Sequence, residues 1–169
     1  MLFRSKIIKG QLVVIVWGPG QQMILTKDGQ SAIQKIPVST ALNGFGFSSD
    51  SATTPTGFMK TGRKFLGKKY QVFVAKQPTD TILGPNEAGD RIVDGKKHTA
   101  EVLTGLIELH GMEDCNSNTF DRQIYIHGTN RERNLGQKAS GGCVRVSNNN
   151  LIWLNNNIPP NTPVFIQGD

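Results

Sequence analysis

One histidine and one cysteine stand in a pattern that suits nucleophilic catalysis. His127 ends an apolar run that begins at Ile124, and Cys143 follows sixteen residues later in the glycine-rich segment Ser140-Gly141-Gly142-Cys143. A free thiol is only a few per cent thiolate at neutral pH, and a neighbouring imidazole raises that fraction. The pattern therefore predicts a thiol nucleophile, Cys143, with His127 as its general base.

The glycines before the thiol leave the backbone of that segment unshielded. We therefore expect the N–H groups of Gly142 and Cys143 to bind the oxyanion that forms when a thiolate attacks a carbonyl. The next predicted helix begins about five residues after Cys143, too far for its dipole to act on the thiol. Most of the activation must then come from His127.

Each of these residues also has a plainer interpretation, because buried structural cysteines and hydrogen-bonded histidines at strand ends are common. His110, Cys115, His127 and Cys143 are an alternative zinc set, but the sequence has no C-x-x-C pair and no H-x₃₋₅-H pair. No metal or cofactor is expected. His110 is assigned to a strand end and His98 to a solvated loop. The two cysteines either form one disulfide, or one of them is a reactive thiol.

Short apolar segments bounded by Gly, Pro, Asn or Asp predict strands at residues 12–17, 23–26, 33–38, 70–75, 102–109, 122–126 and 164–167. One helix is expected at 149–156, with Ser147 or Asn148 as its N-cap. Residues 43–69 and 77–99 are rich in Gly, Pro and Lys and are predicted to be irregular connections that frame a cleft. The expected fold class is mainly β with a few short helices.

Composition places the chain among ordinary globular proteins. It has 169 residues, of which 37% are hydrophobic and 19% charged, so we expect a single domain over 1–169 with a core of about 11–167. Its 19 glycines and eight prolines favour strands and turns over a helical bundle. Its apolar runs are far shorter than the ~18 residues that a membrane span needs, so membrane insertion is not expected.

The net charge of +6 is enough to attract a polyanion such as nucleic acid or an anionic wall polymer. The basic residues are scattered, however, and the densest stretch, from Lys60 to Lys69, is interpreted as a solvated turn rather than a polyanion patch. The aromatic–basic strand motifs of RNA-binding domains are missing. Nucleic acid is therefore not an expected partner.

The chemistry-bearing segments resemble a known family. His127-Gly128-Thr129 followed by Ser140-Gly141-Gly142-Cys143-Val144-Arg145 is similar to the signature of the L,D-transpeptidase catalytic domain, the YkuD-type family. The segments Pro37-Val38-Ser39-Thr40 and Thr54-Pro55-Thr56-Gly57 and the final strand also match, so the resemblance covers nearly all of residues 12–167. One departure is Gly141, where family members often carry His or another polar residue. The resemblance implies a sandwich or barrel-like β-sheet with a cleft.

It also implies cysteine acyl transfer on peptidoglycan stem peptides. Cys143 would attack the carbonyl of the third stem residue, usually diaminopimelate, and expel the terminal D-alanine. The carbonyl of Gly128 would orient the imidazole of His127, which would later deprotonate the acceptor.

Four further residues are expected to contact the substrate. Ser140 and Gly141 lie in the loop before the thiol. Arg145, just after it, either holds a substrate carboxylate through a bidentate contact or pins the loop through a salt bridge. Tyr125 is two residues before His127 on the same predicted strand, so it is expected to face the same cleft.

The acyl acceptor separates three activities that the same residues can perform. An amine from a neighbouring stem gives a 3→3 cross-link, a protein amine gives anchoring to the wall, and water gives L,D-carboxypeptidase activity. If Met1 is the natural start, we expect a cytoplasmic enzyme that trims soluble muropeptides during recycling. The alternative is an exported transpeptidase of the periplasm or cell envelope whose leader was removed. A catalytically silent peptidoglycan-binding domain is a third hypothesis.

Overall fold

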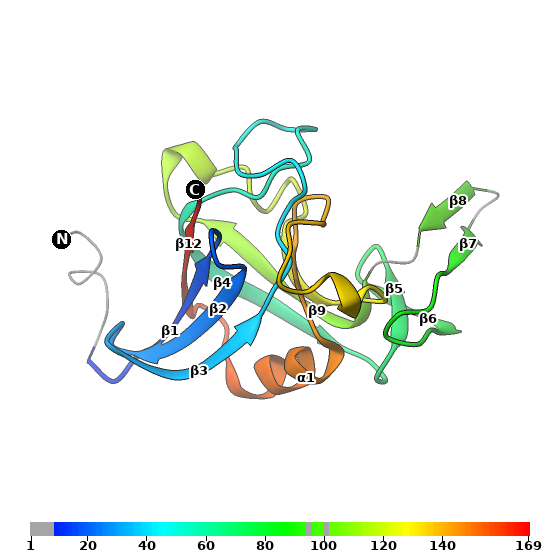
Figure 1. The fold of residues 1–169 in the computed structure, drawn as a ribbon, viewed down its shortest axis with the longest axis horizontal. Coiled ribbons are helices and arrows are strands. Elements are labelled where there is room, and N and C mark those ends of the chain that lie inside the picture. The colour runs from blue at the N-terminus through cyan, green and yellow to red at the C-terminus, as the bar shows by residue number, and fades with distance from the viewer. Residues whose placement is uncertain (1–8, 94–95, 100–101) are drawn as a thin grey trace.

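The computed structural model describes residues 9–93, 96–99 and 102–169 (Figure 1). Its strands are β1 (Leu12–Trp17), β2 (Gln22–Lys27), β3 (Ser31–Pro37), β4 (Gly57–Leu66), β5 (Gln71–Val74), β6 (Gln77–Ile82), β7 (Asp90–Val93), β8 (Lys96–Thr99), β9 (Leu103–Gly111), β10 (Tyr125–Gly128), β11 (Val144–Val146) and β12 (Pro163–Gln167). The helices are α1 (Asn148–Asn157) and the short 3₁₀ turns η2 (Asp114–Asn116) and η3 (Glu132–Asn134). The predicted mainly β fold class is confirmed.

Ten of the described strands form one mixed sheet, whose main path runs β11-β10-β9-β4-β12-β1-β2-β3. The pairs β1–β12 and β10–β11 are parallel, and the other pairs are antiparallel. The sheet is not closed into a barrel. Ser39, just after β3, forms an isolated bridge with Arg145 of β11, so the two ends of the path approach each other. The hairpin β7–β8 stands apart from this sheet (Figure 1).

One hydrophobic core joins distant parts of this sheet. Alternate residues of the strands point inward, as in Val14 and Val16 of β1 and Val144 and Val146 of β11, and all four are fully buried. They belong to the same cluster as Leu151 of α1. Strands from distant parts of the sheet therefore bury their side chains in the same core, and this burial stabilises the arrangement of the strands.

The helix α1 fits the sequence prediction closely. Ser147 is its N-cap and its hydroxyl accepts a hydrogen bond from the Asn150 N–H at 3.1 Å, which satisfies one of the free donors of the first turn. Leu151 and Leu154 are fully buried where α1 packs against β9, β10 and β4. Within the described residues, no helix is long and apolar enough to cross a membrane.

The predicted irregular connections contain strands that the sequence pattern did not indicate. β4 lies within 43–69, and β6, β7 and β8 lie within 77–99, so His98 is in β8 rather than in a loop. β4 carries three basic residues and two glycines, which hide its alternation, although Met59 and Thr61 are buried. β10 begins at Tyr125 rather than at residue 122, and the three-residue β11 was not predicted.

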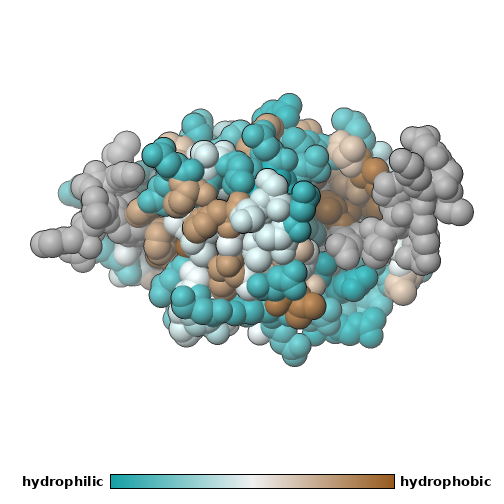
Figure 2. Space-filling model, turned by 90° about the horizontal axis from the view of Figure 1, so that it is seen from above, coloured by the Kyte–Doolittle hydropathy of each residue, from teal (hydrophilic) through white to brown (hydrophobic). Residues whose placement is uncertain are grey.

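The stretch from Lys60 to Lys69 is only partly the solvated turn that was predicted. Arg63 and Lys64 belong to β4, where Arg63 pairs with Glu108 and Lys64 Nζ donates to the Asn155 carbonyl at 2.7 Å. Lys68 lies in the connection to β5. On the face seen in Figure 2, hydrophobic residues form separate areas among hydrophilic ones.

Candidate active site

The pairing of β10 with β11 gathers the predicted site residues on one face of the sheet. His127 is directly opposite Arg145 in the parallel register, while Ile126 and Val144 of the same strands point into the core. Because side chains alternate along a strand, Tyr125 lies on the same side as His127. Cys143 immediately precedes β11 and packs against Tyr125.

A β-bulge lies at the histidine. The register between β10 and β9 shifts between His127 and Gly128, a type of irregularity that re-aims side chains beside active sites. A Cβ at Gly128 would lie 2.5 Å from the carbonyl oxygen of Leu103 and 2.5 Å from Oδ1 of Asn148. Only glycine fits there, so the close packing of β9 and α1 against this residue fixes the end of β10.

The contact expected between Gly128 and the imidazole is present. Nδ1 of His127 lies 2.7 Å from the Gly128 carbonyl oxygen, and the side chain is 3% exposed. A carbonyl oxygen only accepts hydrogen bonds, so Nδ1 carries a proton and Nε2 is the nitrogen that can act as a base. The geometry thus suits the predicted general base, although this role stays a prediction.

The Cys143 sulfur lies beside β10. The backbone N–H of Tyr125 donates to Sγ at 3.3 Å, and Sγ–H donates to the Gln123 carbonyl at 3.4 Å. The first contact favours the thiolate, because it stabilises negative charge, whereas the second holds the neutral thiol. Burial, reinforced by the nearby Cys143, raises the pKa of the Tyr125 phenol to about 12, so this phenol stays protonated near neutral pH.

The loop before Cys143 is held by its own serine. The Ser140 hydroxyl donates to the Cys143 carbonyl at 2.6 Å and accepts from the Gly142 N–H at 3.1 Å. The Ser140 hydroxyl therefore supports the loop, and its contact with substrate stays a prediction. An oxyanion role for the Gly142 N–H would require its hydrogen bond to Ser140 to open. Gly142 has φ +139°, a conformation that favours glycine.

Arg145 matches the second of its two interpretations more closely. Its side chain is almost fully buried, and Nη1 donates to the Ala139 carbonyl at 3.1 Å. The guanidinium thus pins the segment that leads into the loop through this carbonyl, and the predicted salt bridge stays a prediction. Contact with a substrate carboxylate stays a prediction.

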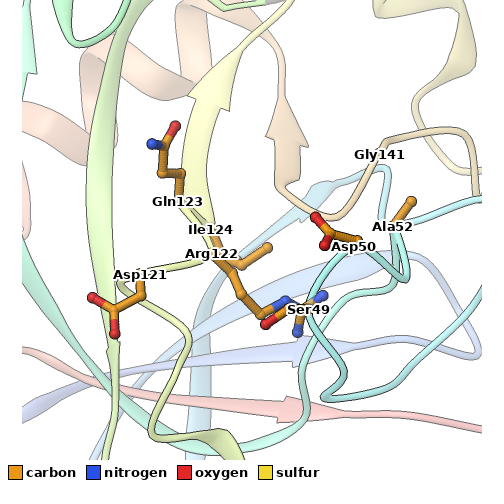
Figure 3. A pocket seen from close by; sticks show the side chains of 8 residues that line it. All are labelled: Ser49, Asp50, Ala52, Asp121, Arg122, Gln123, Ile124 and Gly141. Atoms are coloured by element: carbon orange, nitrogen blue, oxygen red, sulfur yellow. The ribbon is translucent and has the colours of Figure 1, made fainter.

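A pocket of about 440 Å³ opens beside the loop (Figure 3). Its lining is formed by Ser49, Asp50, Ala52, Asp121, Arg122, Gln123, Ile124 and Gly141. Gly141 is exposed, and a Cβ added there would have no atom within 4 Å. The predicted substrate-binding position therefore borders open space next to Cys143.

A buried carboxylate that the sequence analysis missed lies next to Tyr125. Glu108 is 1% exposed and receives hydrogen bonds from Arg63 and Lys76 at 3.0 and 2.8 Å. Burial alone would raise the pKa of Glu108, but these two cations outweigh burial and hold the pKa below its ordinary value. Lys76 Nζ also lies 5.6 Å from the centre of the Tyr125 ring. No local sequence motif indicates this cluster, because Arg63, Lys76 and Glu108 lie far apart in the sequence.

The alternative zinc set does not assemble. The described residues contain no group of three or more His, Cys, Asp or Glu side chains placed to hold a metal ion. His110 stacks on Phe120 with ring centres 4.5 Å apart, and Cys115 is exposed in η2. Both cysteines are free, so the predicted option of one disulfide is wrong for this structure.

Known proteins share this arrangement of strands. The family model of the L,D-transpeptidase catalytic domain (YkuD) matches residues 11–166. The putative L,D-transpeptidase YqjB of Bacillus subtilis (strain 168) is 46% identical over 50 residues, which are 29% of this chain and 28% of that protein.

Solved structures agree on the fold. An L,D-transpeptidase from Mycobacterium smegmatis has a TM-score of 0.57 at 15% identity, covering 93% of this chain and 58% of that one. An L,D-transpeptidase from Xylanimonas cellulosilytica DSM 15894 has a TM-score of 0.56 at 18% identity, covering 95% of this chain and 62% of that one. The fold is that of an L,D-transpeptidase catalytic domain, and the chain belongs to this YkuD family. It spans less than two thirds of the length of these relatives.

Proposed function

We propose that this protein is a cysteine acyltransferase that acts on the tetrapeptide stems of peptidoglycan. Membership of the family supports the class of reaction. The observation that carries the assignment of residues is the placement of Cys143 Sγ against the Tyr125 N–H, beside the strand whose His127 donates from Nδ1 to Gly128. This arrangement presents a sulfur and a basic nitrogen on the same face of the sheet.

In the proposed first step, His127 takes the thiol proton and the Cys143 sulfur attacks the carbonyl carbon of diaminopimelate, the third stem residue. A thioester forms as the C–N bond to the terminal D-alanine breaks. The leaving amine receives the proton from the imidazolium. In the second step His127 removes a proton from the acceptor, which attacks the thioester carbon and releases the thiolate.

We propose water as the main acceptor, so that tetrapeptide is trimmed to tripeptide during muropeptide recycling. The exposed position of Gly141 supports this proposal, because the loop before Cys143 borders an open pocket through which water can reach a thioester. An amine of another stem peptide is the second candidate. Asp50 and Asp121 at the rim of this pocket favour it, since carboxylates attract an ammonium group.

Incubation of the protein with a purified disaccharide-tetrapeptide, followed by mass spectrometry, tests this function. Tripeptide and free D-alanine should accumulate, with cross-linked dimer as a minor product. Disaccharide-pentapeptide should react slowly, because the bond after diaminopimelate is then not the terminal one. Abundant 3→3 dimer with little tripeptide would refute hydrolysis, and failure to release D-alanine would refute the proposed acyl transfer.

A further inference from the structure

Arg122 fastens the segment that faces the nucleophile loop. Its Nη2 donates to the Thr53 carbonyl at 2.7 Å, and its Nη1 donates to the Gly46 carbonyl at 3.1 Å. A longer contact of 3.4 Å joins Nη2 to the Ser51 hydroxyl. Figure 3 shows the side chain reaching toward the segment that carries Ser49. One planar guanidinium therefore links both ends of residues 46–53.

The segment held by Arg122 contains two residues in an unfavourable backbone conformation. Asp50 and Ala52 both have positive φ, at +60° and +52°, without being glycine. Such residues persist only where surrounding contacts determine their conformation, and they concentrate at functional sites. The Arg122 hydrogen bonds to Thr53 and Gly46 bracket these two residues, so they contribute to fixing this conformation together with the Asn43 side chain, which donates to the Ser51 carbonyl.

From this segment a short chain of contacts leads to the thiol. Thr54, next to Thr53, donates from its hydroxyl to the Gly142 carbonyl at 2.8 Å. The Thr54 hydroxyl is itself fixed by accepting from the Ala41 N–H at 2.9 Å. Gly142 immediately precedes Cys143, and a Cβ at Gly142 would lie 3.3 Å from the Thr53 carbonyl oxygen. The position of the loop therefore depends on the segment that Arg122 holds.

Arg122 is also joined to the thiol through the next residue of the turn that precedes β10. The next residue, Gln123, supplies the carbonyl that accepts from Cys143 Sγ, and it too has positive φ, at +57°. Burial lowers the pKa of Arg122, and the negative charge of a Cys143 thiolate opposes this shift. Other titratable or charged groups on this side of the sheet are Tyr125 and His127 of β10, Glu108 and Lys76 next to Tyr125, and Arg145 opposite His127. Asp50 and Asp121 line the adjacent pocket.

We infer that Arg122 is a positioning residue for Cys143, which holds the loop through Thr53 and Thr54 and places a fixed positive charge near the sulfur. The charge stabilises the thiolate, so the thiol is more reactive near neutral pH than it would be with a neutral residue at 122. This inference rests on the proposed function only in taking Cys143 as the nucleophile. Its prediction for the thiol itself does not depend on the identity of the substrate.

The test is the pH profile of iodoacetamide alkylation at Cys143, followed by peptide mapping in the full chain to separate Cys143 from Cys115. Two variants divide the contributions of Arg122. Arg122→Lys keeps the charge but loses the planar fork, and Arg122→Gln keeps an amide donor but loses the charge. Arg133→Gln is the matched control, because Arg133 is an exposed arginine that contacts Asn86 in a distant loop.

Arg122→Gln should raise the midpoint of the profile by about one pH unit, so that alkylation below the midpoint slows about tenfold. Arg122→Lys should recover most of the midpoint, and Arg133→Gln should match the unmodified chain. Thermal unfolding of each variant shows whether it is folded. If Arg122→Gln does not fold, the alkylation profile of Arg122→Lys is compared with that of the unmodified chain instead. The midpoint of the Arg122→Lys profile should then remain close to that of the unmodified chain.

A folded Arg122→Gln variant with an unchanged midpoint would overturn the inference, as would a midpoint in Arg122→Lys shifted by a full unit. These outcomes are distinct from a failure of the proposed function. A shifted midpoint together with no release of D-alanine from tetrapeptide would reject the function and leave the role of Arg122 standing.

Discussion

Nδ1 of His127 hydrogen-bonds to the carbonyl of the adjacent Gly128 at 2.7 Å, so a contact within one dipeptide fixes the tautomer of the imidazole. The β-bulge at this pair and the tight packing around Gly128 keep the carbonyl in place. In the proposed mechanism this leaves Nε2 as the base that serves both the thiol and the acceptor.

Replacement of this histidine should expose its role through pH. His127→Ala is expected to slow acylation near neutral pH by roughly 10²–10⁴, the usual contribution of a positioned base. The loss should shrink as the pH approaches ~8.5, where a free thiol ionises without help. The measurement is the rate of D-alanine release against pH. His110→Ala is the control, because His110 stacks on Phe120 away from this contact. An equal loss at every pH would instead indicate a structural histidine.

Removal of the Ser140 hydroxyl should loosen the nucleophile loop. Ser140→Ala leaves the Gly142 N–H and the Cys143 carbonyl without this partner, and Ser140 is almost fully buried. The expected cost is about 1–3 kcal/mol in the free energy of unfolding, measured by urea denaturation. Activity should fall as well. Ser117→Ala, at an exposed serine in another loop, should change stability by less than about 0.5 kcal/mol. Equal stabilities of the two variants would contradict this role for Ser140.

The buried Glu108 predicts a particular dependence of stability on pH. Its pKa is held below the ordinary value in the folded state, so it binds protons less readily there than in the unfolded chain. Its contribution is therefore complete above the ordinary carboxyl pKa of 4.5 and is lost as the pH falls through the lowered folded value. Glu108→Gln should be less stable than the unmodified chain at neutral pH, and the difference should narrow below pH 4.5. A constant difference from neutral pH to strongly acidic pH, measured by denaturant unfolding, would show that the charge is unimportant.

The fold class and the helix could be predicted because their signals are local. The six-residue run of β1 and the Ser147 cap with two prolines after the helix have one plausible interpretation each, and the structure places both elements there. β4 could not be predicted in the same way. Its basic residues resemble a solvated turn, and only pairing with β9 and β12 and the contact of Arg63 with Glu108 make it a strand.

The candidate site shows the same division. His127 and Cys143 could be identified because each lies in a short local motif, and the contact of His127 with Gly128 involves adjacent residues. The structure brings His127 and Cys143 to one face of the sheet. Arg122 and Thr54 lie 21 and 89 residues before Cys143 and act on its loop only through tertiary contacts, so no motif marks them. Ser140 was identified from its place in the motif, but the direction of its hydroxyl depends on the loop conformation.

Localisation of the acyl group tests the central proposal most directly. The protein is mixed with excess disaccharide-tetrapeptide, quenched in acid after a short time, digested and mapped by mass spectrometry. The account predicts the tripeptide acyl group on Cys143, no acyl group on the exposed Cys115, and loss of both adduct and D-alanine release in Cys143→Ala while Cys115→Ala keeps them. Undiminished D-alanine release by Cys143→Ala, or an acyl group found on Cys115 instead, would contradict it.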